Sequence, residues 1–69
     1  GVFTDGACQP NPGPGGWGAV RVRDGQILAA AHGAERHTTN NRMELLGMIA
    51  GLEMVDPAEA DEVFSDSQL

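Results

Sequence analysis

Residues 39–54, TNNRMELLGMIAGLEM, form the stretch on which the fold of this chain depends. Apolar residues recur there at intervals of three, four and seven, which is typical of an amphipathic helix. They form two sets, namely Met43, Leu46 and Ala50, and Leu45, Ile49 and Leu52. The spacing predicts one long helix with a broad buried face.

The start of this helix is marked by polar residues. Candidate N-caps are Thr38, Thr39, Asn40 and Asn41, and Asn41 with Glu44 has the spacing of a capping box. Gly47 and Gly51 each cost about 1 kcal/mol relative to alanine inside a helix. Both lie on the side of Glu44, where missing side chains let a helix approach a sheet closely, so we expect that side to face strands. Taken alone, Glu44 is a first-turn acid that satisfies the helix dipole.

Three β-prone runs precede the helix, at residues 1–8, 17–23 and 26–32. In the second, WGAVRVR, valines alternate with Arg21 and Arg23, which predicts a half-buried strand with its arginines toward solvent. Asp24-Gly25 between the second and third runs indicates a type I′ hairpin, because that turn needs positive φ at both central residues. The proline- and glycine-rich run 9–16 is predicted to be a surface loop, and residues 33–38 a lead into the helix.

A last short strand is expected at residues 62–65, EVFS, after Asp56-Pro57 ends the segment that follows the helix. A strand-helix-strand crossover favours parallel pairing, so this strand should lie beside residues 2–4. Asp5 and Asp66 then stand at neighbouring strand ends. The helix brings Glu44 over the same place.

Three carboxylates at one place repel strongly, by about 4 kcal/mol per pair at 4 Å with an effective dielectric constant of 20. Either protonation of some of them or a bound cation must compensate. Because no lysine or sulfur ligand lies near, the acids Asp5, Glu44 and Asp66 favour a hard divalent cation bound through oxygen, Mg²⁺ or Mn²⁺.

Length and composition limit the other classes. The chain has 69 residues, one cysteine and a net charge of −6, so it forms one domain at most and contains no internal disulfide. Its apolar runs fall far short of the roughly 20 residues that span a bilayer, and we expect a soluble, cytoplasmic protein that does not bind a membrane. All four arginines precede Glu44 and only acids follow it. For the acids between residues 53 and 62 we favour a solvated turn over a cation site.

Three motifs in order resemble the bacterial type of ribonuclease HI: TDGACQPNPGPGGWGAV at 4–20, TTNNRMEL at 38–45 and SDSQ at 65–68. The match covers nearly the whole chain. It implies an α/β fold with a mixed five-stranded sheet in the order 3-2-1-4-5, flanked by helices. This chain contains the first four strands, in the order 3-2-1-4, with one long helix packed on them.

The resemblance also implies a function, the endonucleolytic cleavage of the RNA strand of an RNA/DNA hybrid by a two-metal-ion mechanism that yields 5′-phosphate and 3′-hydroxyl products. The implied catalytic residues are Asp5, Glu44 and Asp66, which bind two Mg²⁺ ions, or Mn²⁺, together with the peptide unit at Gly6. The implied nucleic-acid contacts are Cys8, Asn11, Thr39, Asn40, Asn41 and Gln68. A nuclease domain of a polymerase or integrase-like protein fits TTNNRMEL less well.

The chain also departs from the family. It ends just past the third acid, so residues 1–69 are interpreted as the amino-terminal part of one ribonuclease H domain, and His37 stands where relatives often have arginine. A truncated fragment, one piece of a split or swapped assembly, and part of a longer chain are all compatible origins. We expect such a piece to need a complementary chain or a swapped copy to complete its sheet. The alternative function is a non-catalytic remnant of the same fold that binds metal or hybrid.

Overall fold

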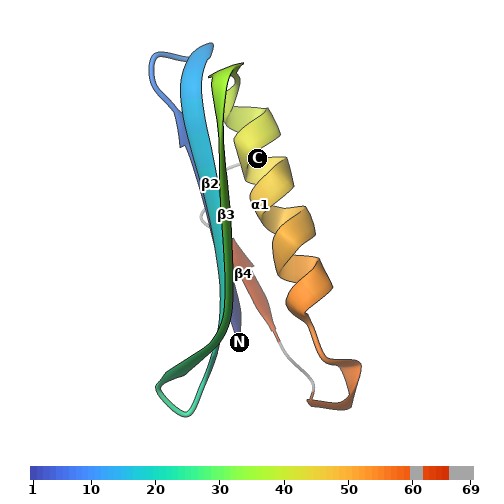
Figure 1. Cartoon of the computed structure of the whole chain (residues 1–69). Coiled ribbons are helices and arrows are strands. Elements are labelled where there is room, and N and C mark those ends of the chain that lie inside the picture. The colour runs from blue at the N-terminus through green and yellow to red at the C-terminus, as the bar shows by residue number, and fades with distance from the viewer. Residues whose placement is uncertain (60–61, 66–69) are drawn as a thin grey trace.

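One long helix packs on one face of a four-stranded sheet in the computed structural model, which describes residues 1–59 and 62–65 (Figure 1). The elements in chain order are β1 Val2–Cys8, β2 Gly13–Arg23, β3 Gln26–Thr38, α1 Asn40–Met54, the 3₁₀ turn η1 Pro57–Glu59 and β4 Val63–Ser65. The sheet order is β3-β2-β1-β4. β1 and β2 pair antiparallel, as do β2 and β3, whereas β4 pairs parallel to β1. The predicted fold class, strand order and parallel crossover are confirmed.

The long helix begins at Asn40 and is capped by Thr39, whose side chain accepts a hydrogen bond from the backbone N–H of Arg42 at 3.2 Å. Thr39 was one of the four candidate caps. Asn41 lies inside the helix, so the capping box of Asn41 with Glu44 is wrong. Threonine satisfies an orphan N–H of the first turn from outside the helix.

The buried side of α1 is narrow, and it consists of Met43, Gly47 and Gly51. The prediction that the two glycines face the strands is confirmed, because a β-carbon on Gly51 would overlap Thr4 and lie 3.2 Å from Val2. The prediction of a broad buried face is wrong for the second apolar set, since Leu45, Ile49 and Leu52 are 56%, 44% and 58% exposed. They lie on the side of the helix turned away from the sheet.

The two faces of β1 differ sharply. Val2, Thr4, Gly6 and Cys8 face the helix, and Val2, Thr4 and Cys8 are buried. Phe3, Asp5 and Ala7 alternate onto the other face and are exposed. On that second face the rings of Phe3 and Phe64 stack with their centroids 5.2 Å apart.

The prediction that both arginines of β2 point to solvent is wrong for Arg21. Arg21 pairs with Val2, which is buried under the helix, and directly paired residues share a face. The side chain of Arg21 is therefore only 17% exposed, and it binds Glu59 at 2.6 Å. Val20, in contrast, pairs with Phe3 on the opposite face.

Both long strands extend beyond their predicted limits. β2 begins at Gly13, inside the predicted loop, and β3 continues through residues 33–38 to Thr38. Pro14 falls at an irregularity of the register between Gly13 and Gly15, where a residue without an N–H is tolerated. The hairpin between these strands is as predicted, with φ of 52° at Asp24 and 77° at Gly25.

The turn after α1 is held to the sheet by two ion pairs. Glu59 in η1 binds both Arg21 and Arg23, so this acid belongs to a structural contact rather than to a solvated turn or a cation site. Hydrogen bonding by the Arg23 guanidinium lowers the pKa of Glu59 below the ordinary value of 4.5. In the described part of the chain, no helix is long and apolar enough to cross a membrane.

We expect Glu59→Gln to lower the melting temperature slightly at neutral pH and to flatten its dependence on pH. Because the pKa of Glu59 is lowered by folding, its contribution is present above the ordinary pKa and is lost as pH falls through the lowered one. Thermal unfolding between about pH 3 and pH 7 measures this. Glu53→Gln, an exposed acid on α1, is the control. Identical profiles for the two variants would contradict the assignment.

Candidate active site

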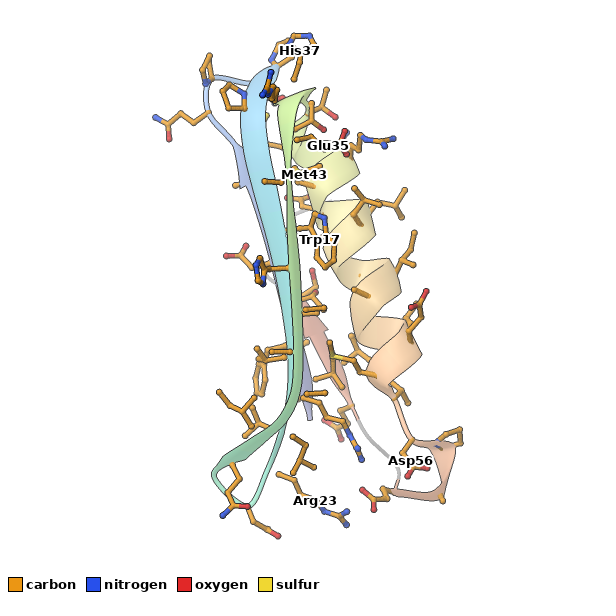
Figure 2. All side chains as sticks on the ribbon, viewed as in Figure 1. Trp17, Arg23, Glu35, His37, Met43 and Asp56 are labelled. Atoms are coloured by element: carbon orange, nitrogen blue, oxygen red, sulfur yellow. The ribbon has the colours of Figure 1, made fainter. Side chains whose placement is uncertain are left out.

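Gly6 on β1 is the point at which the helix touches the sheet most closely. A β-carbon there would overlap the carbonyl group of Met43 and lie 2.7 Å from the backbone nitrogen of Glu44. One turn later, a β-carbon on Gly47 would lie 3.0 Å from the carbonyl oxygen of Asp5. The backbone around Glu44 therefore rests directly on the backbone of residues 5 and 6. Figure 2 shows Met43 directed from the helix toward the sheet.

Asp5 and Glu44 approach this point from different layers. Asp5 is exposed on the sheet face turned away from α1, whereas Glu44 is half-buried on the helix. Asp66, the third predicted acid, lies outside the described residues. Within residues 1–59 and 62–65, no three side chains of His, Cys, Asp or Glu come together. The convergence of three acids thus stays a prediction, and the backbone contact between the segments that carry Asp5 and Glu44 is its observed part.

The side chains of Asp5 and Glu44 are of the type that a hard divalent cation prefers. Asp5 and Glu44 offer carboxylate oxygens, and the absent side chain at Gly6 lets the segments that carry them come into backbone contact. Oxygen donors of this kind are those that Mg²⁺ and Mn²⁺ prefer. The thiol of Cys8 is turned into a separate cluster of contacts.

That cluster joins the end of β1, the following loop and the start of α1. The backbone N–H of Cys8 donates to Oδ1 of Asn40 at 2.6 Å, and the backbone N–H of Asn40 donates to Oδ1 of Asn11 at 3.2 Å. The thiol of Cys8 donates to the same Asn11 oxygen at 3.4 Å and lies 3.5 Å from the carbonyl oxygen of Thr38. Three of the predicted nucleic-acid contacts, Cys8, Asn11 and Asn40, are therefore neighbours in space.

These contacts fix the orientation of two amides. The oxygens of Asn11 and Asn40 accept bonds from within the protein, so their NH₂ groups are the parts left to meet a ligand. Asn41 is exposed on the first turn beside them, and Thr39 uses its hydroxyl as the helix cap. Gln68, the sixth predicted contact, lies outside the described residues. The cluster presents hydrogen-bond donors without adding charge.

Two supporting contacts were not predicted. A β-carbon on Gly15 would lie 2.6 Å from Cβ of Cys8 and 2.7 Å from Cγ2 of Thr38, so Gly15 is what allows these side chains to pack together. Arg42 is held at 2.7 Å by Glu35 on β3. The sequence carried no signal for either contact, because the first depends on the register of β2 with its neighbouring strands and the second on the packing of α1 against β3.

We expect Gly6→Ala to destabilise the fold by about 3 kcal/mol, the upper end of the cost of overpacking, because the added carbon meets backbone that cannot rotate away. Denaturant unfolding measures the change. Gly18→Ala is the matched control, since its β-carbon would find no atom nearer than 3.9 Å. Equal stabilities of the two variants would mean that α1 does not rest on Gly6.

The comparisons with known proteins agree with the fold. The chain is an α/β fold with a mixed sheet of order 3-2-1-4, a crossover helix and one acid, Asp5, near the middle of its first strand. One family model corresponds to it. That model, RNase H, matches residues 1–69. This chain belongs to the RNase H family.

Its relatives include curated ribonucleases H from two bacteria. The protein from Nitrobacter hamburgensis is 55% identical over 67 residues, which are 97% of this chain and 44% of the relative. The protein from Aromatoleum aromaticum is 54% identical, again over 97% of this chain and 43% of the relative. The chain thus spans less than half the length of these curated relatives.

A solved structure shows the same fold. The crystal structure of LC11-RNase H1 in complex with an RNA/DNA hybrid superposes with a TM-score of 0.76 at 32% identity. The similarity covers 97% of this chain and 54% of that one.

Proposed function

We propose that residues 1–69 are the amino-terminal part of a single RNase H domain that hydrolyses the RNA strand of RNA/DNA hybrids. The observation that carries the proposal is the contact at Gly6, which seats the helix turn bearing Glu44 on the strand bearing Asp5, in a chain of the RNase H family. The solved relative in complex with a hybrid supports the choice of substrate.

In this proposal Asp5, Glu44 and Asp66 hold two Mg²⁺ ions, or Mn²⁺, with the peptide unit at Gly6 beside them. Bound ions of this kind activate a water molecule and stabilise the leaving 3′ oxygen, which gives 5′-phosphate and 3′-hydroxyl products. Asp5 and Glu44 supply negative charge from the two sides of β1. The backbone contact at Gly6 fixes the separation between the segments that carry Asp5 and Glu44.

The uncharged cluster of Cys8, Asn11 and Asn40 distinguishes RNA from DNA in this proposal. The outward NH₂ groups of Asn11 and Asn40 suit base-edge acceptors and 2′-hydroxyls in a wide minor groove. Cys8, Thr39, Asn41 and Gln68 complete the proposed contact surface. Because these groups are uncharged, a net charge of −6 is compatible with binding a hybrid through this part of the domain.

The proposal assigns activity to the complete domain and none to the 69 residues alone. The rest of the sheet would come from a complementary chain, from a swapped copy or from further residues of the same chain. A cytoplasmic location fits a chain whose one cysteine is a buried thiol.

The test is hydrolysis of an RNA/DNA hybrid, an RNA duplex and a DNA duplex by the complete domain, with Mg²⁺ and with a chelator. We expect cleavage of the hybrid alone, only with Mg²⁺, and products that carry a 5′-phosphate. Binding of the hybrid without turnover would instead identify the non-catalytic remnant.

We expect Asn11→Ala to weaken hybrid binding about tenfold, the effect of one lost hydrogen bond of roughly 1.4 kcal/mol. The dependence of binding on salt should not change, because a neutral side chain releases no counterions. Gln9→Ala, an exposed residue of the same loop, is the control and should bind like the unaltered domain. A reduced salt slope for Asn11→Ala would show that it acts by disturbing charged contacts elsewhere.

A further inference from the structure

The sheet face turned away from α1 carries a row of residues that includes Asp5. Asp5 pairs with Gly18 on β2, and Gly18 pairs with His32 on β3. Paired residues share a face, so Asp5 and His32 stand on the same surface, two strand spacings or about 10 Å apart. Both are exposed.

The surface between these two residues is open. A β-carbon on Gly18 would meet no atom nearer than 3.9 Å, so nothing rises between Asp5 and His32. The next row along the strands is also made of small residues, since Ala7 pairs with Gly16 and Gly16 with Ala34. An extended polymer backbone can lie on such a floor without displacing side chains.

One positive charge that can bind phosphate lies beside this floor, that of Arg36. Arg36 follows Ala34 by two residues, which places it on the same face of β3, and it is exposed. Arg21 and Arg23 bind Glu59, and Arg42 binds Glu35. Over the described ranges 1–59 and 62–65, Arg36 is therefore the one arginine that makes no ion pair.

The other half of the same face has a different character. Phe3 pairs with Val20 and Val20 with Ala30, and Phe3 stacks on Phe64. This half is apolar, whereas the half beyond Asp5 consists of small residues bordered by His32 and Arg36. The side chains change from apolar to small and polar at the row of Asp5, which indicates that the two halves of this face contact different groups. Only the half beyond Asp5 suits a polyanion.

We propose that His32 and Arg36 are phosphate contacts for the RNA strand of the hybrid, on the floor formed by Ala7, Gly16, Gly18 and Ala34. The proposal rests on the proposed function and adds two residues to its contact surface. His32 donates a hydrogen bond from its imidazole and Arg36 supplies a charge-assisted pair. Four residues apart on one strand, or about 13 Å, the two engage different phosphates.

The RNA strand is the one favoured, because His32 shares its row with Asp5. A carboxylate that holds ions at the cleaved linkage brings the RNA backbone to its own row, and the same backbone then continues over Gly18 toward β3.

The experiment measures hybrid binding as a function of salt in the complete domain, with Glu44→Gln as a common background that prevents cleavage. We expect Arg36→Ala to lower the slope of log K against log salt by about 1, as for one lost phosphate contact. Arg23→Ala, an arginine engaged by Glu59 at the far end of the sheet, should leave the slope unchanged. His32→Ala should weaken binding, and His32→Arg should restore it with a slope increased by about 1.

Neutral methylphosphonate linkages, placed in one strand at a time, identify the strand. If Arg36 contacts RNA, neutral linkages in the RNA strand abolish the effect of Arg36→Ala, whereas those in the DNA strand leave it intact. The proposal is overturned if Arg36→Ala and Arg23→Ala have equal slopes, or if only DNA linkages couple to Arg36. Cleavage by the unaltered domain is scored separately, so loss of this inference leaves the proposed function standing, and loss of activity leaves the slope measurement valid.

Discussion

Asp5→Asn in the complete domain should reduce Mg²⁺-dependent cleavage of an RNA/DNA hybrid by about 10³-fold or more, the loss that corresponds to several kcal/mol of transition-state stabilisation. The fold should persist, because Asp5 is exposed on the sheet face away from the helix. Glu44→Gln and Asp66→Asn are expected to behave in the same way. Initial rates of hybrid hydrolysis, together with thermal unfolding of each variant, measure the two effects separately.

Asp24→Asn is the matched control for this series. It removes one carboxylate at a turn residue with φ of 52°, a conformation that asparagine tolerates. Its activity should equal that of the unaltered domain. If Asp5→Asn cleaved as fast as Asp24→Asn in Mg²⁺, the assignment of Asp5 as a metal ligand would be wrong.

The isolated 69-residue chain should either fold poorly or associate with other copies. Among residues 1–59 and 62–65, Val2 and Met43 are the only large side chains that are fully buried, and a core of this size rarely supplies more than about 3 to 5 kcal/mol. Large apolar side chains remain exposed on both layers, namely Phe3, Ile27, Leu28 and Phe64 on the sheet and Leu45, Ile49 and Leu52 on the helix. At β4 the sheet ends on a strand paired on one side only within the described residues, and such edges recruit other chains.

Sedimentation and hydrogen exchange on the purified chain test this expectation. Adding the remaining part of the domain in trans should restore order and hybrid cleavage together. A chain with exposed apolar residues replaced by polar ones, for example Leu45→Gln and Leu52→Gln, should associate less. A monomer with a cooperative melt and protected amides in β4 would refute the prediction.

The sequence predicted those features that depend on local signals or on general topology. The helix, the Asp24-Gly25 hairpin and the parallel pairing of β4 each follow from spacing, turn chemistry or crossover rules. The three ordered motifs predicted the family, which the match over residues 1–69 shows. Of the predicted site, the clustering of Cys8, Asn11 and Asn40 is seen directly.

What could not be predicted depends on contacts between distant segments. Arg21 faces the helix because its register with Val2 decides its face, and alternation within β2 does not say which face is covered. The early start of β2 at Gly13 depends on partners in β1 and β3, which outweigh the turn preference of glycine and proline. The exposure of Leu45, Ile49 and Leu52 depends on how much of the helix the sheet covers. The periodicity of apolar residues does not give the width of that covered surface.

The glycine contacts between α1 and β1 separate the spacing of helix and strand from the filling of the core. Proteins usually meet these two requirements with the same residues. The distance from the helix to the strand is set at Gly6 and Gly47 by backbone against backbone, not by the size of interlocking side chains. Core residues such as Val2 and Met43 can therefore be exchanged for others of similar volume without re-aiming Glu44. A domain built in this way can drift widely in its interior, or be redesigned there for greater heat resistance, while the backbone segments that carry Asp5 and Glu44 stay in contact.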